Sequence, residues 1–169
     1  MDAGQLFSGS ALGEVAPNGA VRLPEFVRRV IERRSAAERL VLGVHESDPC
    51  VTAHASGQWP AIEAEIERRR LRDEAAGAPS SAHHQRARRA FGLAEEAAAD
   101  RRGRILLPEL MRRRGRIGGL ALFVGTGASF EIWNPDVALE TGDEELRELA
   151  EFRLSERAQR RDSPRRRRR

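Results

Sequence analysis

Short apolar runs separated by polar turns follow one another in the same order twice along this chain. The runs at 40–44, 105–107 and 120–124 have the length of strands. Residues 26–31 place apolar side chains at i, i+1, i+4 and i+5, the spacing of one helix face. Each predicted helix leads into two apolar runs around a loop with Gly or Pro, which indicates a hairpin. Each half therefore predicts strand, turn, strand, helix, strand, turn, strand.

The two halves align without a gap at their first turn, at a constant offset of 84 positions. The offset pairs Gly19 with Gly103, Leu23 with Leu107, Pro24 with Pro108, Glu25 with Glu109, Arg28 with Arg112 and Phe7 with Phe91. In the second copy Asp100 suits the first position of a turn, and Gly103 tolerates positive φ. Pro108 suits the first turn of a helix. An internal duplication is the main prediction about organisation.

Further helices are predicted outside the repeats. Residues 58–72 are amphipathic, with an apolar side of Trp59, Ile62, Ile66 and Leu71, and a break at 77–81 precedes a second helix. The chain is expected to turn at 134–136 and then to form a charged helix that buries Leu146, Leu149, Phe152 and Leu154. The predicted boundaries are 7–56 for repeat 1, 57–90 for a helical linker, 91–137 for repeat 2, 138–160 for a C-terminal helix and 161–169 for a disordered arginine tail.

Composition favours a small core and a charged surface. The chain has 169 residues, which is one domain or two very small ones that share a core. Although 40% of the residues are hydrophobic, only 5% are aromatic. This balance suggests helical segments and oligomerisation rather than a thick sandwich.

All 30 basic residues are arginines, and the formal net charge is +4. Arginine suits phosphate and guanine edges, so the bias is compatible with nucleic acid; a GC-rich genome explains it equally well. Cys50 is the only cysteine, which excludes an internal disulfide or a cysteine zinc site. Neither a signal peptide nor a membrane span is evident, so a cytoplasmic protein is expected.

The second half carries a family resemblance. Asp100-x-x-Gly103-Arg104-Ile-Leu-Leu-Pro108, a short helix, an apolar strand and then Phe130-Glu-Ile-Trp133 resemble the second repeat of the MraZ family. The resemblance covers about residues 5–140. It implies an α+β fold in which two SpoVT/AbrB-like swapped-hairpin repeats form a pseudo-symmetric small barrel with a mostly β core, a helical linker and a C-terminal helix.

The resemblance also implies a function. Members of this family are bacterial transcriptional regulators of the division and cell-wall gene cluster. They form ring-shaped homo-oligomers and bind direct repeats of double-stranded DNA in their own promoter region. A nucleoid-associated regulator is therefore expected, with no membrane and no small-molecule substrate as partner.

The family's Asp-x-x-x-Arg signature is present only in the second copy, as Asp100 and Arg104. The first copy has Ala16 and Ala20 at these positions. Because side chains two apart share a strand face, Arg22 is a candidate to replace the lost charge, together with Arg28 and Arg29 of the following helix. The alternative is that the first repeat has become purely structural.

The predicted DNA-binding residues are Arg104, Arg101, Arg102, Arg22 and Arg28, and the predicted structural positions are Asp100, Gly103, Gly19, Pro24 and Pro108. Arginines at the second turn can neutralise phosphates and release counterions. An arginine that reaches guanine O6 and N7 would add about 1–3 kcal/mol of base discrimination. For Arg104 the alternative is a surface ion pair with Asp100.

Other candidate sites are weaker. Gly125-Thr126-Gly127 is better explained as a hairpin loop than as a phosphate loop, and His83 and His84 as solvated side chains than as metal ligands. No catalytic arrangement stands out, so neither an enzyme nor a metal or other cofactor is expected.

Two alternatives to the regulator remain. One is an AbrB-like antitoxin or transition-state regulator, which the duplication disfavours. The other is an oligomeric interaction protein that has lost DNA binding.

Overall fold

The secondary structure of each half follows the predicted order. A computed structural model describes residues 6–34 and 39–162. In the first half the elements are β1 (Ser10–Glu14), β2 (Ala20–Arg22), α1 (Glu25–Arg34), β3 (Leu40–Val44) and β4 (Val51–Ala55). In the second half they are β5 (Glu95–Ala97), β6 (Arg104–Leu106), α4 (Glu109–Arg114), β7 (Leu120–Gly125) and β8 (Ser129–Trp133). The fold is mixed α+β, with antiparallel strand pairing.

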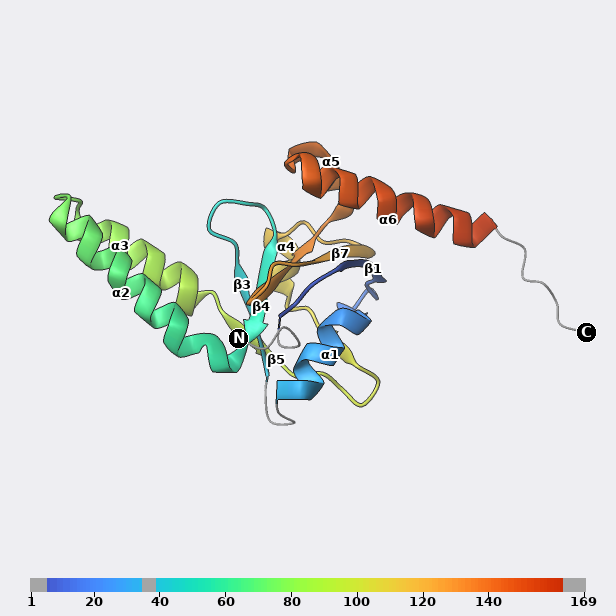
Figure 1. Ribbon diagram of the computed structural model, residues 1–169, viewed down its shortest axis with the longest axis horizontal. Helices are drawn as coiled ribbons and strands as arrows, with labels where there is room; N and C mark the ends of the chain where they lie inside the picture. The colour runs from blue at the N-terminus through green and yellow to red at the C-terminus, as the bar shows by residue number, and fades with distance from the viewer. Residues whose placement is uncertain (1–5, 35–38, 163–169) are drawn as a thin grey trace, which may run out of the picture.

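The remaining helices lie between and after these halves. A 3₁₀ turn η2 (Ser56–Gln58), α2 (Trp59–Ala75), α3 (Ser80–Ala87) and a π-helical turn η3 (Arg88–Gly92) connect β4 to β5. The chain continues after β8 as α5 (Pro135–Thr141) and α6 (Glu144–Asp162). Helices α2 and α3 run side by side as a two-helix arm on one side of the sheet, and α6 projects on the other side (Figure 1). In the described ranges, no helix has both the length and the apolar character needed to cross a bilayer.

The halves exchange their edge strands. The six-stranded sheet has the order β1-β7-β8-β4-β3-β5, so β1 pairs with the second half and β5 with the first. By their position in each half, β1 corresponds to β5, β3 to β7 and β4 to β8. When each strand is replaced by its counterpart, the sheet order reads the same in reverse. At the centre β4 pairs with β8, where Ala53 lies opposite Phe130. Both halves therefore contribute to one continuous sheet.

A closed barrel does not form among the described strands. The sheet is open, because β1 and β5 are its outermost strands. Strands β2 and β6, of three residues each, pair with each other in a separate two-stranded ribbon. Because they satisfy each other's backbone groups, they do not join the two sheet edges. In this respect the observed β structure differs from the predicted barrel.

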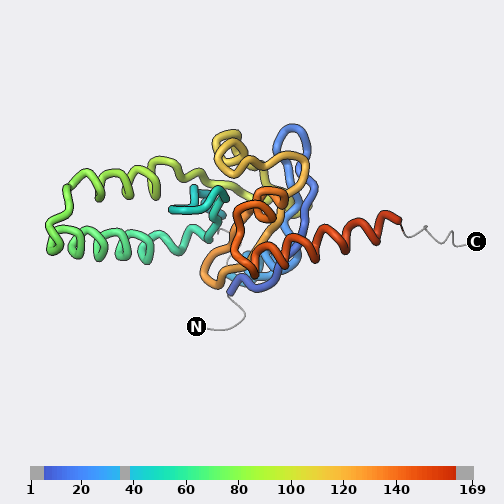
Figure 2. The backbone as a smooth tube through the Cα atoms, turned by 90° about the horizontal axis from the view of Figure 1, so that it is seen from above, coloured from blue at the N-terminus to red at the C-terminus, as the bar shows by residue number. Residues whose placement is uncertain are grey.

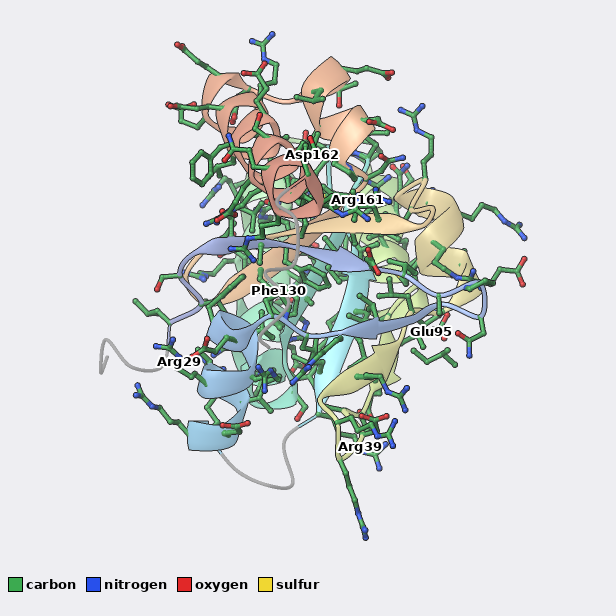
Figure 3. All side chains as sticks on the ribbon, turned by 90° about the vertical axis from the view of Figure 1, so that its right-hand side faces the viewer. Arg29, Arg39, Glu95, Phe130, Arg161 and Asp162 are labelled. Atoms are coloured by element: carbon green, nitrogen blue, oxygen red, sulfur yellow. The ribbon has the colours of Figure 1, made fainter. Side chains whose placement is uncertain are left out.

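The core lies between the sheet, the ribbon and α1. Phe7 stacks edge-on against Phe130 with ring centroids 5.0 Å apart, and Val21 and Ile105 of the ribbon are buried in the same cluster. Figure 3 shows Phe130 in the interior, whereas Arg29 and Arg39 point outward at the periphery. A second cluster packs α5 and α6 against the sheet, with buried residues Cys50, Leu122, Trp133, Val137, Ala138, Leu146 and Ala150. Contiguous apolar burial of this kind is the main stabilising contribution to the fold.

Among the described residues, three large apolar side chains on helical segments are exposed, and for Phe152, which was predicted to be buried, the prediction was wrong. Leu71 of α2 is 53% exposed and Phe152 of α6 is 57% exposed. Both residues lie on helices that extend beyond the sheet (Figure 1). The guanidinium carbon of Arg153 lies 5.1 Å from the centroid of the Phe152 ring. Phe91, the counterpart of the buried Phe7, is 42% exposed in η3.

Both predicted segments after β8 also differ from the structure. The predicted turn at 134–136 is the start of α5, where Asn134 Oδ1 accepts a hydrogen bond from the backbone N–H of Asp136. Arg161 and Asp162, which were assigned to the tail, continue α6. The rest of the predicted tail, 163–169, lies outside the described residues.

Candidate nucleic-acid interface

The β2–β6 ribbon has a turn at each end. Val21 lies opposite Ile105, and the hydrogen bonds that extend the pairing are equivalent in the two halves. The N–H of Leu23 donates to the carbonyl of Gly103 at 2.8 Å, and the N–H of Leu107 donates to that of Gly19 at 2.9 Å. The turn before β2 therefore lies beside the end of β6, and the turn before β6 beside the end of β2.

The second turn is organised by the carboxylate of Asp100. One oxygen accepts the backbone N–H groups of Arg102 and Arg104, both at 2.9 Å, and the other accepts the Arg104 guanidinium at 2.9 Å. The hydrogen bond from the Arg104 backbone N–H is the largest effect that holds the pKa of Asp100 below its ordinary value. Gly103 adopts φ +70°, which favours glycine. The ion pair considered as an alternative for Arg104 is thus present, and the Arg104 side chain remains 48% exposed.

The first turn has the same backbone path without the charges. Gly19 adopts φ +90°, and its N–H donates to the carbonyl of Ala16 at 2.8 Å, as Gly103 does to Asp100 at 2.9 Å. Ala16 has no side-chain acceptor. Instead Asn18 Oδ1 accepts the N–H of Ala20 at 3.1 Å. Asn18 therefore makes one of the turn contacts that Asp100 makes in the second copy, and sequence reasoning missed it.

The outward face of the ribbon is charged at one end only. Ala20, Arg22, Arg104 and Leu106 are its more accessible positions, since Val21 and Ile105 point into the core. The antiparallel register sets Arg22 opposite Arg104 and Ala20 opposite Leu106. Arg22 therefore lies beside the intact second turn rather than at the first. Arg22 and Ala20 do lie on the same face of β2, as predicted. The charge of Arg22, however, lies next to that of Arg104 and does not replace the charge missing from the first turn.

A shallow depression joins arginines from both halves. Its volume is about 270 Å³, and its charged lining residues are Arg22, Arg28, Glu32, Asp100, Arg101 and Arg102. Arg28 comes from α1, and its Nε donates to the carbonyl of Leu23 at 3.2 Å. This anchors the side chain against the second turn. Four of the five predicted DNA-binding arginines thus line one depression, and Arg104 lies on the adjoining ribbon face.

Pro24 and Pro108, two of the predicted structural positions, make equivalent hydrogen bonds in the two halves. The carbonyl of Pro24 accepts the N–H of Arg28 at 3.0 Å, and that of Pro108 accepts the N–H of Arg112 at 3.0 Å. Each proline stands directly before its helix rather than within the first turn, as the extended ψ of 149° at Pro108 shows. Each thereby directs a helix, and one arginine of that helix, toward a turn of the ribbon.

Arg112 is the counterpart of Arg28 and was not assigned a role from the sequence. It reaches across to the first turn, where Nη1 donates to the carbonyl of Pro17 at 3.3 Å. A Cβ on Gly19 would lie 3.0 Å from Arg112 Nε. The constant offset between the copies pairs Arg112 with Arg28, which was the signal that could have identified it.

The other candidate residues belong to the scaffold. Gly125-Thr126-Gly127 connects β7 to β8, with Thr126 Oγ1 donating to the carbonyl of Ser129 at 3.0 Å. Cys50 is buried, and burial is the main effect that raises the pKa of its thiol. Across the described ranges, no three His, Cys, Asp or Glu side chains are grouped so that they could hold a metal ion.

Comparison with known proteins assigns the family. The chain is 31% identical over 123 residues to the transcriptional regulator MraZ of Coxiella burnetii strain Dugway 5J108-111, covering 70% of this chain and 73% of that protein. The chain belongs to the MraZ family. It is also 27% identical over 141 residues to the MraZ of Pseudomonas savastanoi pv. phaseolicola, covering 83% of this chain and 88% of the relative. For the MraZ of Pseudomonas aeruginosa strain LESB58 the identity is 26% over 132 residues, with 78% and 82% covered. No protein-family model matches the chain.

Membership in the MraZ family confirms the resemblance found in the second half. The matched length of 123–141 residues is too long for one repeat and extends well beyond the second turn. The family relationship therefore concerns most of the chain.

Proposed function

We propose that this protein is a DNA-binding transcriptional regulator whose contact with double-stranded DNA is made by the arginine cluster at the second turn. The cluster comprises Arg22, Arg28, Arg101, Arg102 and Arg104. The proposal is supported by the names of the relatives, which are transcriptional regulators. The observation that carries it is the register that sets Arg22 opposite Arg104, because it gathers guanidinium groups from both halves on one surface.

The chemistry of the cluster suits a phosphate backbone. Guanidinium groups make charge-assisted, often bidentate hydrogen bonds to phosphate oxygens. Asp100 is held ionised by its backbone hydrogen bonds and orients Arg104, while the guanidinium keeps N–H donors that do not face the carboxylate. Phosphate contacts would set the position of the duplex, and Arg104 or Arg22 would read guanine edges.

One such cluster per chain would bind DNA weakly, so the proposal includes assembly. A ring-shaped homo-oligomer that places several clusters on direct repeats would raise the effective concentration of each contact. The proposed targets are direct repeats upstream of the division and cell-wall gene cluster, including the protein's own promoter. A nucleoid location follows from this proposal.

The proposed fold is a duplication of SpoVT/AbrB-like swapped-hairpin units at 7–56 and 91–137, joined by the helical linker 57–90. The exchange of edge strands supports it: β1 pairs with β7 and β5 with β3. The equivalent hydrogen bonds at the two turns support it as well. A DNA-contacting ribbon shared by both units follows from that arrangement.

A fluorescence titration tests the function. DNA from upstream of the gene is compared with a scrambled duplex at about 50 and 200 mM salt, where phosphate contacts predict a steep loss of affinity. Arg104→Ala should weaken binding to the upstream duplex by about tenfold or more. Arg68→Ala is the matched control, because Arg68 is an exposed arginine of the arm, paired with Glu65 at 2.6 Å. Equal affinity for both duplexes would contradict sequence-specific binding.

A second candidate is an oligomeric interaction protein with lost DNA binding. The substitution of the signature by Ala16 and Ala20, and the internal pairing of Arg104 with Asp100, favour it. This candidate predicts no saturable binding to either duplex, whereas light scattering still detects an oligomer.

A further inference from the structure

The outward face of the β2–β6 ribbon has a charged half and an apolar half. At the charged end the register sets Arg22 opposite Arg104. At the other end it sets Ala20 opposite Leu106. Leu106 is 57% exposed, whereas Ile105 beside it is buried in the core. The apolar half therefore carries a large, accessible side chain on the same face as the arginines.

The apolar half follows from the altered signature of the first copy. Ala20 stands where the second copy has Arg104. Because alanine ends at its Cβ, Leu106 is the longest side chain on this half of the face. An exposed leucine is common on protein surfaces, but this one is continuous with the surface proposed to meet DNA.

The end of the ribbon that carries Leu106 lies at the edge of the molecule. The N–H of Leu107 donates to the carbonyl of Gly19, so Leu106 lies next to the first turn. Figure 2 shows the first turn, in blue, beside α4, in yellow, while the arm and α6 extend in two other directions. This end of the ribbon is therefore placed to meet a large ligand.

The charges near Leu106 do not favour phosphate. Leu106 borders a depression of about 540 Å³ whose charged lining residues are Glu95, Glu96 and Glu109. Glu96 pairs with Arg39 at 3.6 Å, and Glu109 pairs with Arg113 at 2.9 Å. Two of the three carboxylates are thus balanced, and no cation in the lining attracts a phosphate. A DNA contact made by Leu106 would be with a base.

Thymine has the matching apolar group. The major groove admits a two-stranded β-ribbon, and thymine exposes its C5-methyl group there. Leu106 lies two residues from Arg104 on one strand face, which is about 6.6 Å along the strand. Base pairs are spaced about 3.4 Å along the duplex. A ribbon that follows the groove would therefore place Leu106 about two base pairs from a guanine that Arg104 reads.

We propose that Leu106 is a specificity-determining residue that contacts the C5-methyl group of a thymine near the guanine read by the charged half. This inference deepens the proposed DNA contact and rests on it. The arginines supply attraction to the duplex and recognition of guanine, and Leu106 distinguishes thymine from bases that lack the methyl group.

A fluorescence titration with a modified duplex tests the contact. Every thymine of the upstream duplex is replaced by deoxyuridine, which keeps the base pairs and removes only the C5-methyl groups. The wild type should bind this duplex about fourfold more weakly than the thymine duplex, and more weakly still where several copies bind together. Leu106→Ala should bind both duplexes with equal affinity, because it lacks the side chain that contacts the methyl group.

Leu71→Ala is the matched control. Leu71 is 53% exposed, a fraction similar to that of Leu106, but it lies on α2 in the arm. This variant should prefer the thymine duplex as strongly as the wild type does. Circular dichroism melting verifies that both variants are folded, and light scattering should give Leu106→Ala the mass of the wild type.

Three results would overturn the proposal. Equal affinity of the wild type for the two duplexes would mean that no methyl group contributes to binding. A preference that persists in Leu106→Ala would come from another side chain or from the altered stiffness of the duplex. A lower mass of Leu106→Ala would place Leu106 in a contact between copies of the chain.

The outcome can be distinguished from that of the proposed function. Weaker binding of Arg104→Ala, together with equal affinity of the wild type for the thymine and uracil duplexes, would reject the role of Leu106 and retain the arginine contact. Equal affinity of the wild type for the upstream and scrambled duplexes would reject sequence-specific binding and this inference with it.

Discussion

The two turns of the ribbon have the same backbone and different chemistry. Both contain a glycine with positive φ, and in both that glycine donates to the residue three before it. The second turn adds a carboxylate and an arginine, whereas the first has alanine at both positions. The backbone of the turn therefore does not need the Asp-Arg pair. In the first turn a glycine, main-chain hydrogen bonds and the uncharged side chain of Asn18 hold the same backbone path.

The largest expected effect concerns the two glycines. A Cβ on Gly19 would lie 2.7 Å from the carbonyl oxygen of Leu107, a backbone atom that cannot move away. A Cβ on Gly103 would lie 2.7 Å from Cδ of Arg28, a side chain that can. Gly19→Ala should therefore cost about 3 kcal/mol of stability, and Gly103→Ala about 1–2 kcal/mol. Urea unfolding followed by circular dichroism measures both, and equal losses would refute the difference.

Restoring the signature in the first turn tests whether that turn meets DNA. The double variant Ala16→Asp, Ala20→Arg introduces the pair found at Asp100 and Arg104. If the duplex also reaches this end of the ribbon, affinity for the upstream DNA should rise about tenfold, an effect of about 1.4 kcal/mol. The salt dependence should steepen by about one phosphate contact. Unchanged affinity and salt slope in the titration would identify the first turn as purely structural.

Asp100 should make the second turn, and not the first, sensitive to pH. Since its folded-state pKa is lowered, its contribution to stability is present above the unfolded-state pKa and is lost as pH falls through the folded value. Asp100→Asn should therefore be less stable than the wild type at pH 7, and the difference should disappear well below about pH 4. Unfolding midpoints at neutral and acidic pH measure this. A difference that stays the same at all pH values would argue against the carboxylate as its cause.

The smallest expected effect is at Asn18, which makes one exposed hydrogen bond to the N–H of Ala20. Asn18→Ala should cost about 0.5 kcal/mol, because water can replace an exposed partner. The same urea experiment detects it. A much larger loss would mean that the first turn depends on this side chain more than the geometry indicates.

Local patterns in the sequence predicted the elements of both halves because these depend on nearby residues. The apolar run at 105–107 and the spacing in α1 were sufficient to identify a strand and a helix. The prediction of burial failed at Phe152, because helical periodicity identifies an apolar face without showing whether anything covers it; Leu71, on the apolar side of α2, is exposed for the same reason. The patterns also failed at 134–136, where Asn134 and Pro135 are as suitable for a helix start as for a turn.

The candidate site was only partly predictable. The arginines of the second turn were identified from a contiguous motif. Asn18 and Arg112 were missed, because Asn18 replaces Asp100 from a different turn position and Arg112 acts on the turn of the opposite half.

By itself, the sequence determined that two similar segments recur at a constant offset of 84 positions, which residues form each turn, and that the Asp-Arg signature is present only once. Only the tertiary structure decided that Arg22 joins Arg104 at one end of a ribbon shared by both halves, and that the arm and α6 lie at opposite ends. The physical reason is that strand register is a long-range choice. It depends on which buried residues, such as Val21 and Ile105, meet across the core, and no local pattern contains that information.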